Sequence, residues 1–391
     1  MKTSILILDP NGDTELILRR PNLSQNEKEE EPGVESSSEA ADGEPQTHET
    51  PTVVFCDRSA SIHTVADIRE LKPDDDKSQS IEIRFRVSSP HLILASPMFK
   101  AMLDGPFSEG VRNERGLYEI KAFEWSAEAL LILLNIIHGH HRSTPKTVDV
   151  SLLEQVAVLV DYYQCHEIVE VFADKWMAAH QDAFPKDYGN ACMSWMFFAW
   201  VFSDEKLFKT MVSIAVRFSR EPLQTSLPIP NTIVGQSRII HFVLPEPSNA
   251  HPEKLESRRQ FLINQVIDNV YGMLESLWAT NDGCSVECSC MLLGSLMKQM
   301  RAHGLQIPRP AGWTGQEKSV IEWRQFINTL NSPAWSQDRQ FGGSTKHECT
   351  FKDKTLPWME DMARTYMSGI EFQDFRSVKV SPNDAPSVEP K

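Results

Sequence analysis

The chain has 391 residues, of which 41% are hydrophobic, and this length suffices for two or three globular domains. Its formal net charge is -15, and residues 24–50 alone hold nine acidic side chains against one lysine. Non-specific nucleic-acid binding requires clustered basic residues that displace counterions, so this balance argues against a nucleic-acid partner. Neither a signal-peptide core nor an apolar run of the ~20 residues that span a bilayer is visible. We therefore expect an intracellular protein of the cytoplasm or the nucleus, with no membrane partner.

The first elements predicted are two short β-rich runs, residues 4–8 and 14–18, on either side of Asn11-Gly12. An Asn-Gly pair favours a hairpin turn, so the sequence predicts that these two strands pair with each other. The acidic segment at about 21–51 is rich in Glu, Ser, Gly and Pro. It cannot bury enough apolar surface to offset the entropy of ordering, so we expect a disordered insertion.

The best strand pattern is residues 81–87, IEIRFRV, which alternates with period two. The alternation predicts an apolar side toward a core, and Glu and Arg side chains toward solvent. Ser89-Pro90 and Ser96-Pro97 follow directly. A serine hydroxyl can cap a helix and proline suits the first helical position, so these pairs predict two short helices capped by Ser89 and Ser96.

The rest of the N-terminal part reads as one strand and three helices. The strand is expected at 117–120 and the helices at 126–137, 151–163 and 167–179, the second of them with a capping box from Ser151 to Glu154. Beyond residue 187 the sequence becomes helical. Helices are expected at 190–202, 206–218, 255–280, 290–303, 316–330 and 354–366, before a disordered tail at 377–391.

The residues VSSPHL at 87–92 and LASPMFKAML at 94–103 resemble the central segment of a BTB (POZ) domain, of the type found in filamentous fungi. The resemblance implies a BTB/POZ α/β module over residues 1–180, interrupted by the acidic insertion. Residues 187–370 resemble the helical extension of the same fungal proteins. The expected fold is therefore α+β, with an all-α C-terminal region. The insertion departs from the family pattern and puts in doubt the domain-swapped dimer, which uses the N-terminal elements.

Phe107-Ser108-Glu109 lies directly after the second Ser-Pro helix. In BTB domains that recruit a cullin scaffold, this loop carries a hydrophobic residue, any residue and then Glu, and the apolar side chain fills a groove on the cullin. The resemblance thus implies partner-binding roles for Phe107 and Glu109. The alternative is structural, with Phe107 capping the domain core and Glu109 solvated.

The C-terminal cysteines suggest a metal site. Cys288-x-Cys290 and His347-x-Cys349 together offer three thiolates and one imidazole, which are the ligands that Zn²⁺ prefers in closed tetrahedral sites. Cys284 is an alternate ligand. Such a site would close a long loop. The spacing is not that of a standard zinc finger, and the alternative is that these are small buried thiols beside an incidental histidine.

Other residues with chemical potential are expected to be structural. Cys56, Cys165 and Cys192 are isolated in sequence and are expected to pack. The histidines in His138-Gly-His-His, residues 138–141, are too close together to converge on one ion, so we expect a polar helix end with cations near its negative pole.

No nucleophile elbow, phosphate-binding loop or dinucleotide fingerprint is present, so the sequence does not indicate an enzyme. The expected function is protein–protein interaction: self-association as a homodimer or higher oligomer, with recruitment of a cullin-type ubiquitin ligase and a client held by the helical half. Two alternatives stay open. One is a transcription-linked or structural scaffold without cullin binding, and the other is a zinc-stabilised helical binding module.

Overall fold

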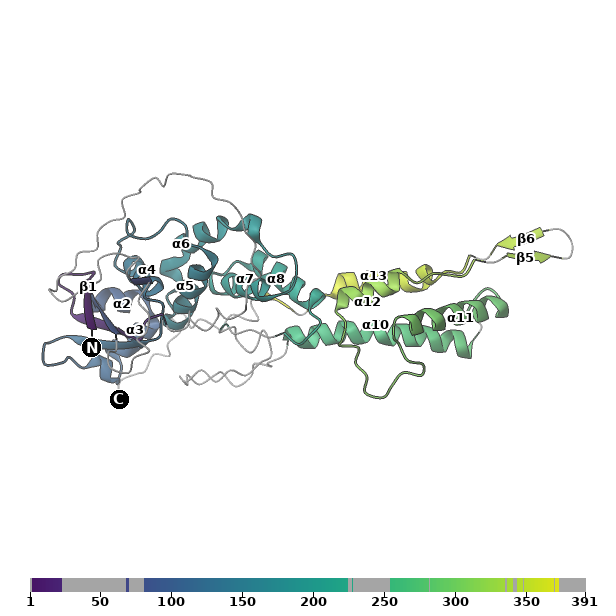
Figure 1. The fold of residues 1–391 in the computed structure, drawn as a ribbon, viewed down its shortest axis with the longest axis horizontal. Helices are drawn as coiled ribbons and strands as arrows, with labels where there is room; N and C mark the ends of the chain where they lie inside the picture. Colours follow the sequence, from purple (N-terminus) through teal and green to yellow (C-terminus); the bar gives the residue numbers. More distant parts are fainter. Residues whose placement is uncertain are drawn as a thin grey trace, which may run out of the picture. The chain divides into compact units, whose positions relative to one another are not determined.

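The computed structural model describes residues 2–22, 68–69, 81–223, 227, 254–280, 282–334, 336–339, 343–346, 348–368 and 370–372. The chain divides into two compact units (Figure 1). The first comprises Met1–Ala183 and Trp200–Ser203, and the second Phe184–Ala199 and Asp204–Lys391. Among the described helices, none combines the length and apolar character that a bilayer-spanning segment needs.

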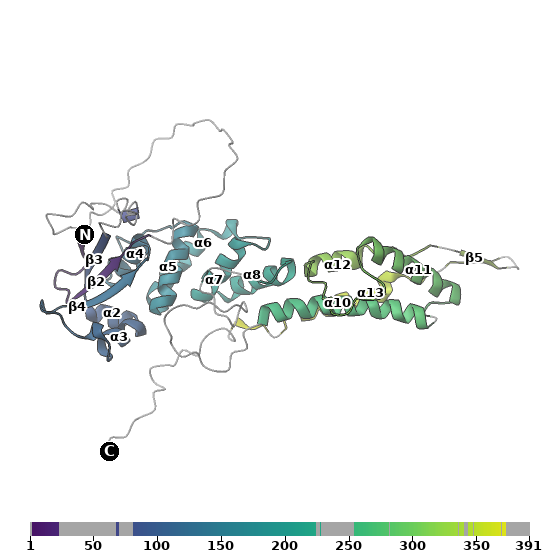
Figure 2. The ribbon, with the colours of Figure 1, turned by 60° about the horizontal axis from the view of Figure 1, so that its bottom comes forward.

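Among its described elements, the first unit has a four-stranded sheet and the five α-helices given next. The strands are β1 (Lys2–Ile7), β2 (Thr14–Arg19), β3 (Ile81–Val87) and β4 (Tyr118–Phe123), and the helices are α2 (Ser89–Ala95), α3 (Pro97–Asp104), α4 (Ala127–Ile137), α5 (Val150–Tyr163) and α6 (His166–Ala178). Two 3₁₀ turns, η2 (Ser108–Gly110) and η3 (Gln181–Ala183), complete it. Every residue of α4 is buried, and Figure 2 shows this helix between the sheet and α5.

The strand order is β1-β3-β2-β4, so the predicted pairing of the first two strands is wrong. β3 lies between them, parallel to β1 and antiparallel to β2. The connection from β1 to β2 is long enough to cross the end of β3, and the backbone amides of Leu8 and Asp9 both donate to the Arg86 carbonyl. A Cβ on Gly12 would lie 2.5 Å from the Val87 carbonyl oxygen. Asn11-Gly12 therefore serves a close crossing over β3 and not a tight hairpin.

One row of side chains across the sheet shows why β3 is central. Four residues on successive strands lie directly opposite one another: Leu6, Phe85, Leu16 and Ile120. All four are at most 1% exposed. Inserting β3 between β1 and β2 therefore places its largest apolar side chain at the middle of the buried face.

The charged side of β3 is less exposed than the alternation predicts. Glu82 is 0% exposed, and its carboxylate accepts from the guanidinium groups of Arg19 at 3.0 Å and Arg84 at 2.6 Å. The prediction of a solvent-facing Glu82 is wrong because arginines on two strands enclose and neutralise it. At the expected start of the insertion, Asn22 is buried and its side-chain amide donates to the Ile68 carbonyl at 2.9 Å, so this residue belongs to the folded unit. Residues 23–51 of the predicted insertion and the predicted tail at 377–391 lie outside the described residues.

The two Ser-Pro helices form, but their starts differ from the prediction in one case. Ser96 caps α3 and accepts from the Phe99 amide at 3.0 Å, as predicted. The N-cap of α2 is Ser88 and not Ser89, and it makes no capping bond with its side chain. Asp13 supplies the acceptor instead, 2.8 Å from the Ser89 amide. A residue from the end of another strand thus caps α2.

For the next two helices as well, one predicted cap is confirmed and the other is wrong. Ser126 caps α4 and accepts from the Ala129 amide at 3.3 Å. The capping box predicted at Ser151 is wrong, because the N-cap of α5 lies two residues earlier, at Asp149, whose side chain accepts from the Leu152 amide at 2.8 Å.

The second unit is mostly helical. Its elements are α7 (Asn190–Val201, the last two residues of which belong to the first unit), α8 (Glu205–Phe218), α10 (Lys254–Ala279), α11 (Val286–Ala302), α12 (Val320–Asn328), α13 (Phe351–Thr365), β5 (Ser336–Arg339) and β6 (Gly343–Lys346). β5 and β6 pair antiparallel, so the expectation of an all-α C-terminal region is wrong. α11 begins four residues before its predicted start because Ser285 caps it.

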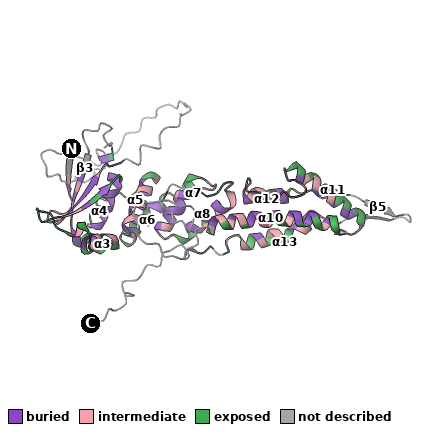
Figure 3. Cartoon of the chain, turned by 90° about the horizontal axis from the view of Figure 1, so that it is seen from below, coloured by how far each residue is buried: buried purple, intermediate pink, exposed green. Residues whose placement is uncertain are grey.

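The long helix α10 organises this unit. It packs against α8, α11, α12 and α13. Figure 3 shows buried residues along α10. Those that recur at helical spacing include Leu255, Leu262, Ile263, Val266, Ile267 and Val270. This spacing gives α10 a continuous apolar stripe for its neighbours.

Candidate partner-binding loop and metal site

The predicted partner-binding residues lie on the turn that ends α3. Gly105 terminates the helix and its amide donates to the Ala101 carbonyl, while Phe107 is the N-cap of η2. Phe107 is 48% exposed, so the core does not enclose its ring. Glu109 is partly exposed, and its carboxylate accepts from the Ser108 hydroxyl at 3.0 Å. An apolar and an acidic side chain are thus both available at one turn.

Two more apolar side chains of the same stretch are exposed. Leu94, at the end of α2, is 88% exposed, the largest fraction among the large hydrophobic residues of the described chain, and Val111, just after η2, is 70% exposed. Single exposed hydrophobic residues are common on protein surfaces. Three within residues 94–111 mark this stretch as a candidate interaction surface.

The C-terminal cysteines form a cluster. The sulfur atoms of Cys284, Cys288 and Cys349 all lie within 4.8 Å of one another. Cys284 lies in the loop after α10, and Cys288 lies in the first turn of α11, whose N-cap Ser285 precedes it. Cys349 immediately precedes Thr350, the N-cap of α13. The N-terminal ends of α11 and α13 therefore each place a thiol beside the loop that follows α10.

Polar contacts around the cluster fix this loop. Lys354 of α13 donates to the Asp282 carboxylate at 2.7 Å, and Asp282 also accepts from the Ser276 hydroxyl at 2.9 Å. The hydrogen bond from Lys354 lowers the pKa of Asp282. A Cβ on Gly283 would lie 2.9 Å from the Ser289 amide nitrogen, so the loop folds closely onto α11. α13 is thus tied to this loop independently of the thiols.

These three residues can hold a metal ion. In a tetrahedral zinc site with Zn–S bonds of about 2.3 Å, ligand sulfurs lie about 3.8 Å apart, which is within the 4.8 Å that bounds the three sulfurs here. Cys288 is buried, Cys349 is partly buried and Cys284 is exposed. Desolvation and the adjacent Cys288 and Cys349 thiols raise the pKa of Cys284 to about 11. Metal binding would therefore release protons from the cluster.

The ligand set differs from the one predicted. Cys288 and Cys349 are brought together, and their companion is the alternate ligand Cys284. Cys290 is exposed on α11 and does not belong to the group. Two residues along a helix turn a side chain about 200° around the axis, so Cys288 and Cys290 cannot face one ion from the same helix. The fourth predicted ligand, His347, lies outside the described residues.

Two other cysteines are structural, as their isolation suggests. Cys165 and Cys192 are buried, and burial raises the pKa of each to about 12. Such thiols are protonated at neutral pH and unreactive. Cys56 lies outside the described residues.

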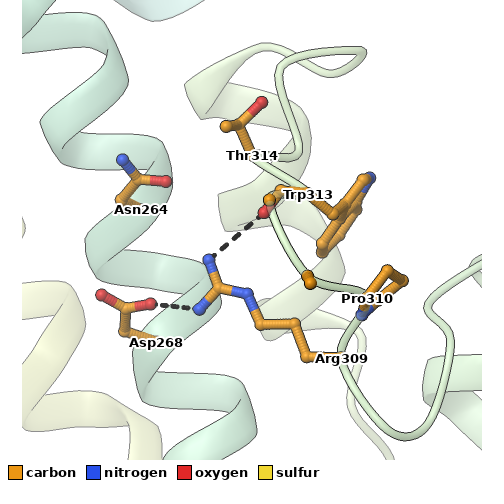
Figure 4. A pocket seen from close by; sticks show the side chains of 8 residues that line it. Asn264, Asp268, Arg309, Pro310, Trp313 and Thr314 are labelled. Carbon is orange, nitrogen blue, oxygen red and sulfur yellow. Dashed lines mark hydrogen bonds and ion pairs between the residues drawn. The ribbon is translucent and has the colours of Figure 1, made fainter.

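A groove that no sequence motif indicated lies between α10 and the loop that precedes α12 (Figure 4). Its volume is about 560 Å³, and Asn264 and Asp268 of α10 face Arg309 and Trp313 of the loop. Arg309 donates to Asp268 at 2.5 Å and to the Trp313 carbonyl at 3.4 Å. The arginine thus ties the loop to α10, and its charge is already compensated.

No protein-family model matches the chain, and no curated protein matches it either. The exposed turn at Phe107 and the cysteine cluster are therefore the basis for a functional proposal.

Proposed function

We propose that this chain is a non-enzymatic BTB-type interaction protein. Its N-terminal unit self-associates and recruits a cullin-type ubiquitin-ligase scaffold, and its helical unit holds a client protein. The observation that carries the proposal is the exposure of Phe107. Phe99 and Leu103, the preceding aromatic and aliphatic residues of α3, are 0% and 5% exposed, whereas Phe107 is 48% exposed beside the carboxylate of Glu109.

An exposed aromatic side chain next to a carboxylate suits a protein groove with a basic rim. Aromatic anchors that fill a partner's pocket account for most of the binding energy of many interfaces. Leu94 and Val111, which are also exposed between residues 94 and 111, offer further apolar surface on this stretch. Together they support a binding role for the stretch from α2 to η2.

The test is calorimetric titration of the full chain with the N-terminal domain of a cullin. Phe107→Ala should weaken binding about thirtyfold or more, since truncating an anchor costs about 2 kcal/mol or more. Phe123→Ala is the matched control, because Phe123 is a similarly exposed phenylalanine (53%) of the same unit, at the end of β4. Equal affinities for the two variants, or no binding by the unmodified chain, would overturn the cullin assignment.

Light scattering on the same samples measures self-association. A chain that forms dimers or larger oligomers but does not bind the cullin would fit the alternative of a transcription-linked or structural scaffold. A monomer that fails to bind would contradict both roles.

We further infer that the cysteine cluster holds a structural zinc ion. Cys284, Cys288 and Cys349 supply three thiolates, and the cluster joins the start of α11 to the start of α13. The sequence supplies a fourth candidate, His347, two residues before Cys349 and outside the described residues. A zinc ion here would close the chain between α11 and α13, which supports a stable binding surface in the helical unit.

Elemental analysis of the purified full chain tests this site. We expect about one zinc per chain, lost in Cys288→Ser and in Cys349→Ser. Cys290→Ser is the matched control, because Cys290 lies on the same helix outside the cluster, and it should keep its zinc. His347→Ala should lower zinc occupancy if the imidazole is the fourth ligand. If the unmodified chain contains no metal, the zinc proposal is wrong and the three cysteines only pack against their neighbours.

A further inference from the structure

His138 links the end of α4 to the start of α2. It is the C-cap of α4, and its Nδ1 lies 2.8 Å from the Leu134 carbonyl oxygen. Its Nε2 lies 3.0 Å from the backbone nitrogen of Ser88, the N-cap of α2. A carbonyl can only accept and a backbone amide can only donate. Both bonds therefore exist together only when His138 is neutral and carries its hydrogen on Nδ1.

The groups that face His138 come from three places. The ring of His91, on α2, stacks on it with centroids 5.2 Å apart, and the His91 Nδ1 lies 2.9 Å from the Ser88 hydroxyl. The ring of His140, just beyond α4, lies 6.5 Å away. Asp9, from the connection between β1 and β2, is the carboxylate that acts on it.

These surroundings favour the neutral ring. Burial lowers the pKa of His138, and the nearby His91 and His140 lower it further. The Leu134 carbonyl and Asp9 act in the opposite direction without reversing the shift. The expectation of a cation at this polar helix end is therefore wrong for His138, because its ring is partly buried and accepts from the Ser88 amide in the neutral form.

We propose that His138 is a pH-sensitive latch that holds the start of α2 against the end of α4 and opens when Nε2 gains a proton. The added N–H would then point at the Ser88 N–H, so the bond is replaced by two opposed donors. Ser88 also accepts the first helical bond of α2, from the Leu92 amide at 3.2 Å. Opening the latch therefore loosens the first turn of α2.

The direction of the pH effect follows from the lowered pKa. An imidazole released from the latch takes up a proton more readily than His138 does in the closed structure. The latch is then fully closed above the ordinary histidine value of about 6.5 and weakens as the pH falls below it. Because α2 leads into the exposed stretch with Leu94 and Phe107, acid would weaken partner binding. That consequence rests on the proposed function, whereas the latch does not.

Amide hydrogen exchange of the full chain measures the latch directly. Protection of residues 88–96, corrected for the intrinsic pH dependence of exchange, should fall about fivefold between pH 7.5 and 5.5, the effect of losing one hydrogen bond. His138→Gln keeps an acceptor for Ser88 but has no proton to gain, so its protection should not change. His141→Gln is the matched control, since His141 contacts Phe172 and not the His138 ring, and should respond as the unmodified chain does.

An equal loss of protection in His138→Gln, or none in the unmodified chain, would overturn the latch. If His138→Gln does not fold, imidazole titration by NMR decides: the His138 resonance must titrate below the ordinary range together with the Ser88 amide, and titration at or above that range overturns the proposal. Normal latch behaviour in a chain that binds no cullin at any pH would overturn the proposed function and support the latch.

Discussion

Glu15 is the residue on which the charged face of the sheet converges. Its side chain is 4% exposed and accepts from Arg115 at 2.7 Å, Arg84 at 2.9 Å and Arg86 at 3.4 Å. Removing a carboxylate from water is unfavourable unless opposite charges and hydrogen bonds replace the lost hydration. Here three guanidinium groups from two other parts of the chain provide that replacement.

Glu15→Ala should therefore be strongly destabilising, since it removes the buried carboxylate that Arg84, Arg86 and Arg115 share. We expect the free energy of unfolding to fall by about 3–5 kcal/mol, measured by urea denaturation followed by circular dichroism. Glu119→Ala is the control, because Glu119 also contacts Arg115, at 3.6 Å, but its side chain is 34% exposed, and it should cost no more than about 1 kcal/mol. Similar losses in the two variants would contradict the central role of Glu15.

The sequence predicts which side of β3 is apolar but not how deeply its charges are buried. Period-two alternation places Glu82 opposite the core face, yet arginines of β2 and β3 enclose it. Which arginines meet which carboxylates depends on the β2–β3 register, and that register follows from a strand order the Asn-Gly pattern did not reveal. Local patterns carry no information about partners more than 60 residues away.

At the scale of elements, the positions of helices and strands were mostly predictable and their caps were not. Ser96 and Ser126 cap their helices because the acceptor is local. α2 is capped by Asp13, 76 residues before Ser89, so the competing acceptor becomes visible only once β2 and β3 are adjacent. A serine before a proline therefore identifies a helix start to within one residue, while tertiary contacts decide which group caps it.

The cap on α2 gives a pH-dependent prediction. Burial would raise the pKa of Asp13, but the bonds from the amide and hydroxyl of Ser89 outweigh burial and lower it from its ordinary value of 3.8. A depressed carboxyl pKa contributes stability above the ordinary value and loses it as the pH falls toward the folded-state pKa. Asp13→Ala should thus cost about 1 kcal/mol at pH 7, and the difference from the unmodified chain should shrink below about pH 4.

Thermal unfolding of both proteins across this pH range measures the difference. Asp13→Asn keeps one acceptor without the charge, so it should recover part of the stability and show little change with pH. A difference that stays constant from pH 7 to pH 3 would rule out the carboxylate as the source.

Gly315, in the loop before α12, allows this loop to pack closely against Ile267 of α10. Its φ is +63°, and a Cβ there would lie 2.2 Å from Cδ1 of Ile267, while its carbonyl accepts from the Trp323 indole at 3.0 Å. Gly315→Ala should cost about 2–4 kcal/mol in unfolding free energy, since backbone strain adds to overpacking. Gly304→Ala separates the two effects, because Gly304 also has a positive φ, +83°, with open space around it, and should cost about 1–2 kcal/mol. Equal losses of unfolding free energy in the two variants, measured by urea denaturation, would show that the Ile267 side chain moves aside without destabilising the fold.

At the scale of the whole molecule, the sequence predicted two of the three clustered cysteines, Cys288 and Cys349, whereas Cys290 lies outside the cluster. Cys288 and Cys349 were selected because thiols attract zinc, and the choice between Cys284 and Cys290 depended on where α11 begins. With a start at residue 290, Cys288 and Cys290 would share a loop and could converge on an ion. Because α11 begins at Val286, Cys288 and Cys290 both lie on the helix and point to different sides of it. The thiol that joins Cys288 and Cys349 is Cys284, from the loop before α11.

The two units predict two responses to metal removal. The cysteine cluster and the helices that it joins belong to the second unit, and the four-stranded sheet belongs to the first. A ligand that binds only the folded state stabilises that state according to its concentration and affinity, so chelating zinc should destabilise the unit that holds the site. In calorimetry of the full chain, EDTA should lower the midpoint of one unfolding transition by several degrees. The other transition should not move.

The cysteine variants assign those transitions. Cys349→Ser should already show the lowered midpoint and should not respond to EDTA, whereas Cys290→Ser should respond as the unmodified chain does. Glu15→Ala, in the sheet, should lower the transition that is insensitive to EDTA. If Glu15→Ala and EDTA instead lower the same transition, the two units unfold together. A metal ion bound between α11 and α13 would then stabilise the first unit as well as the second.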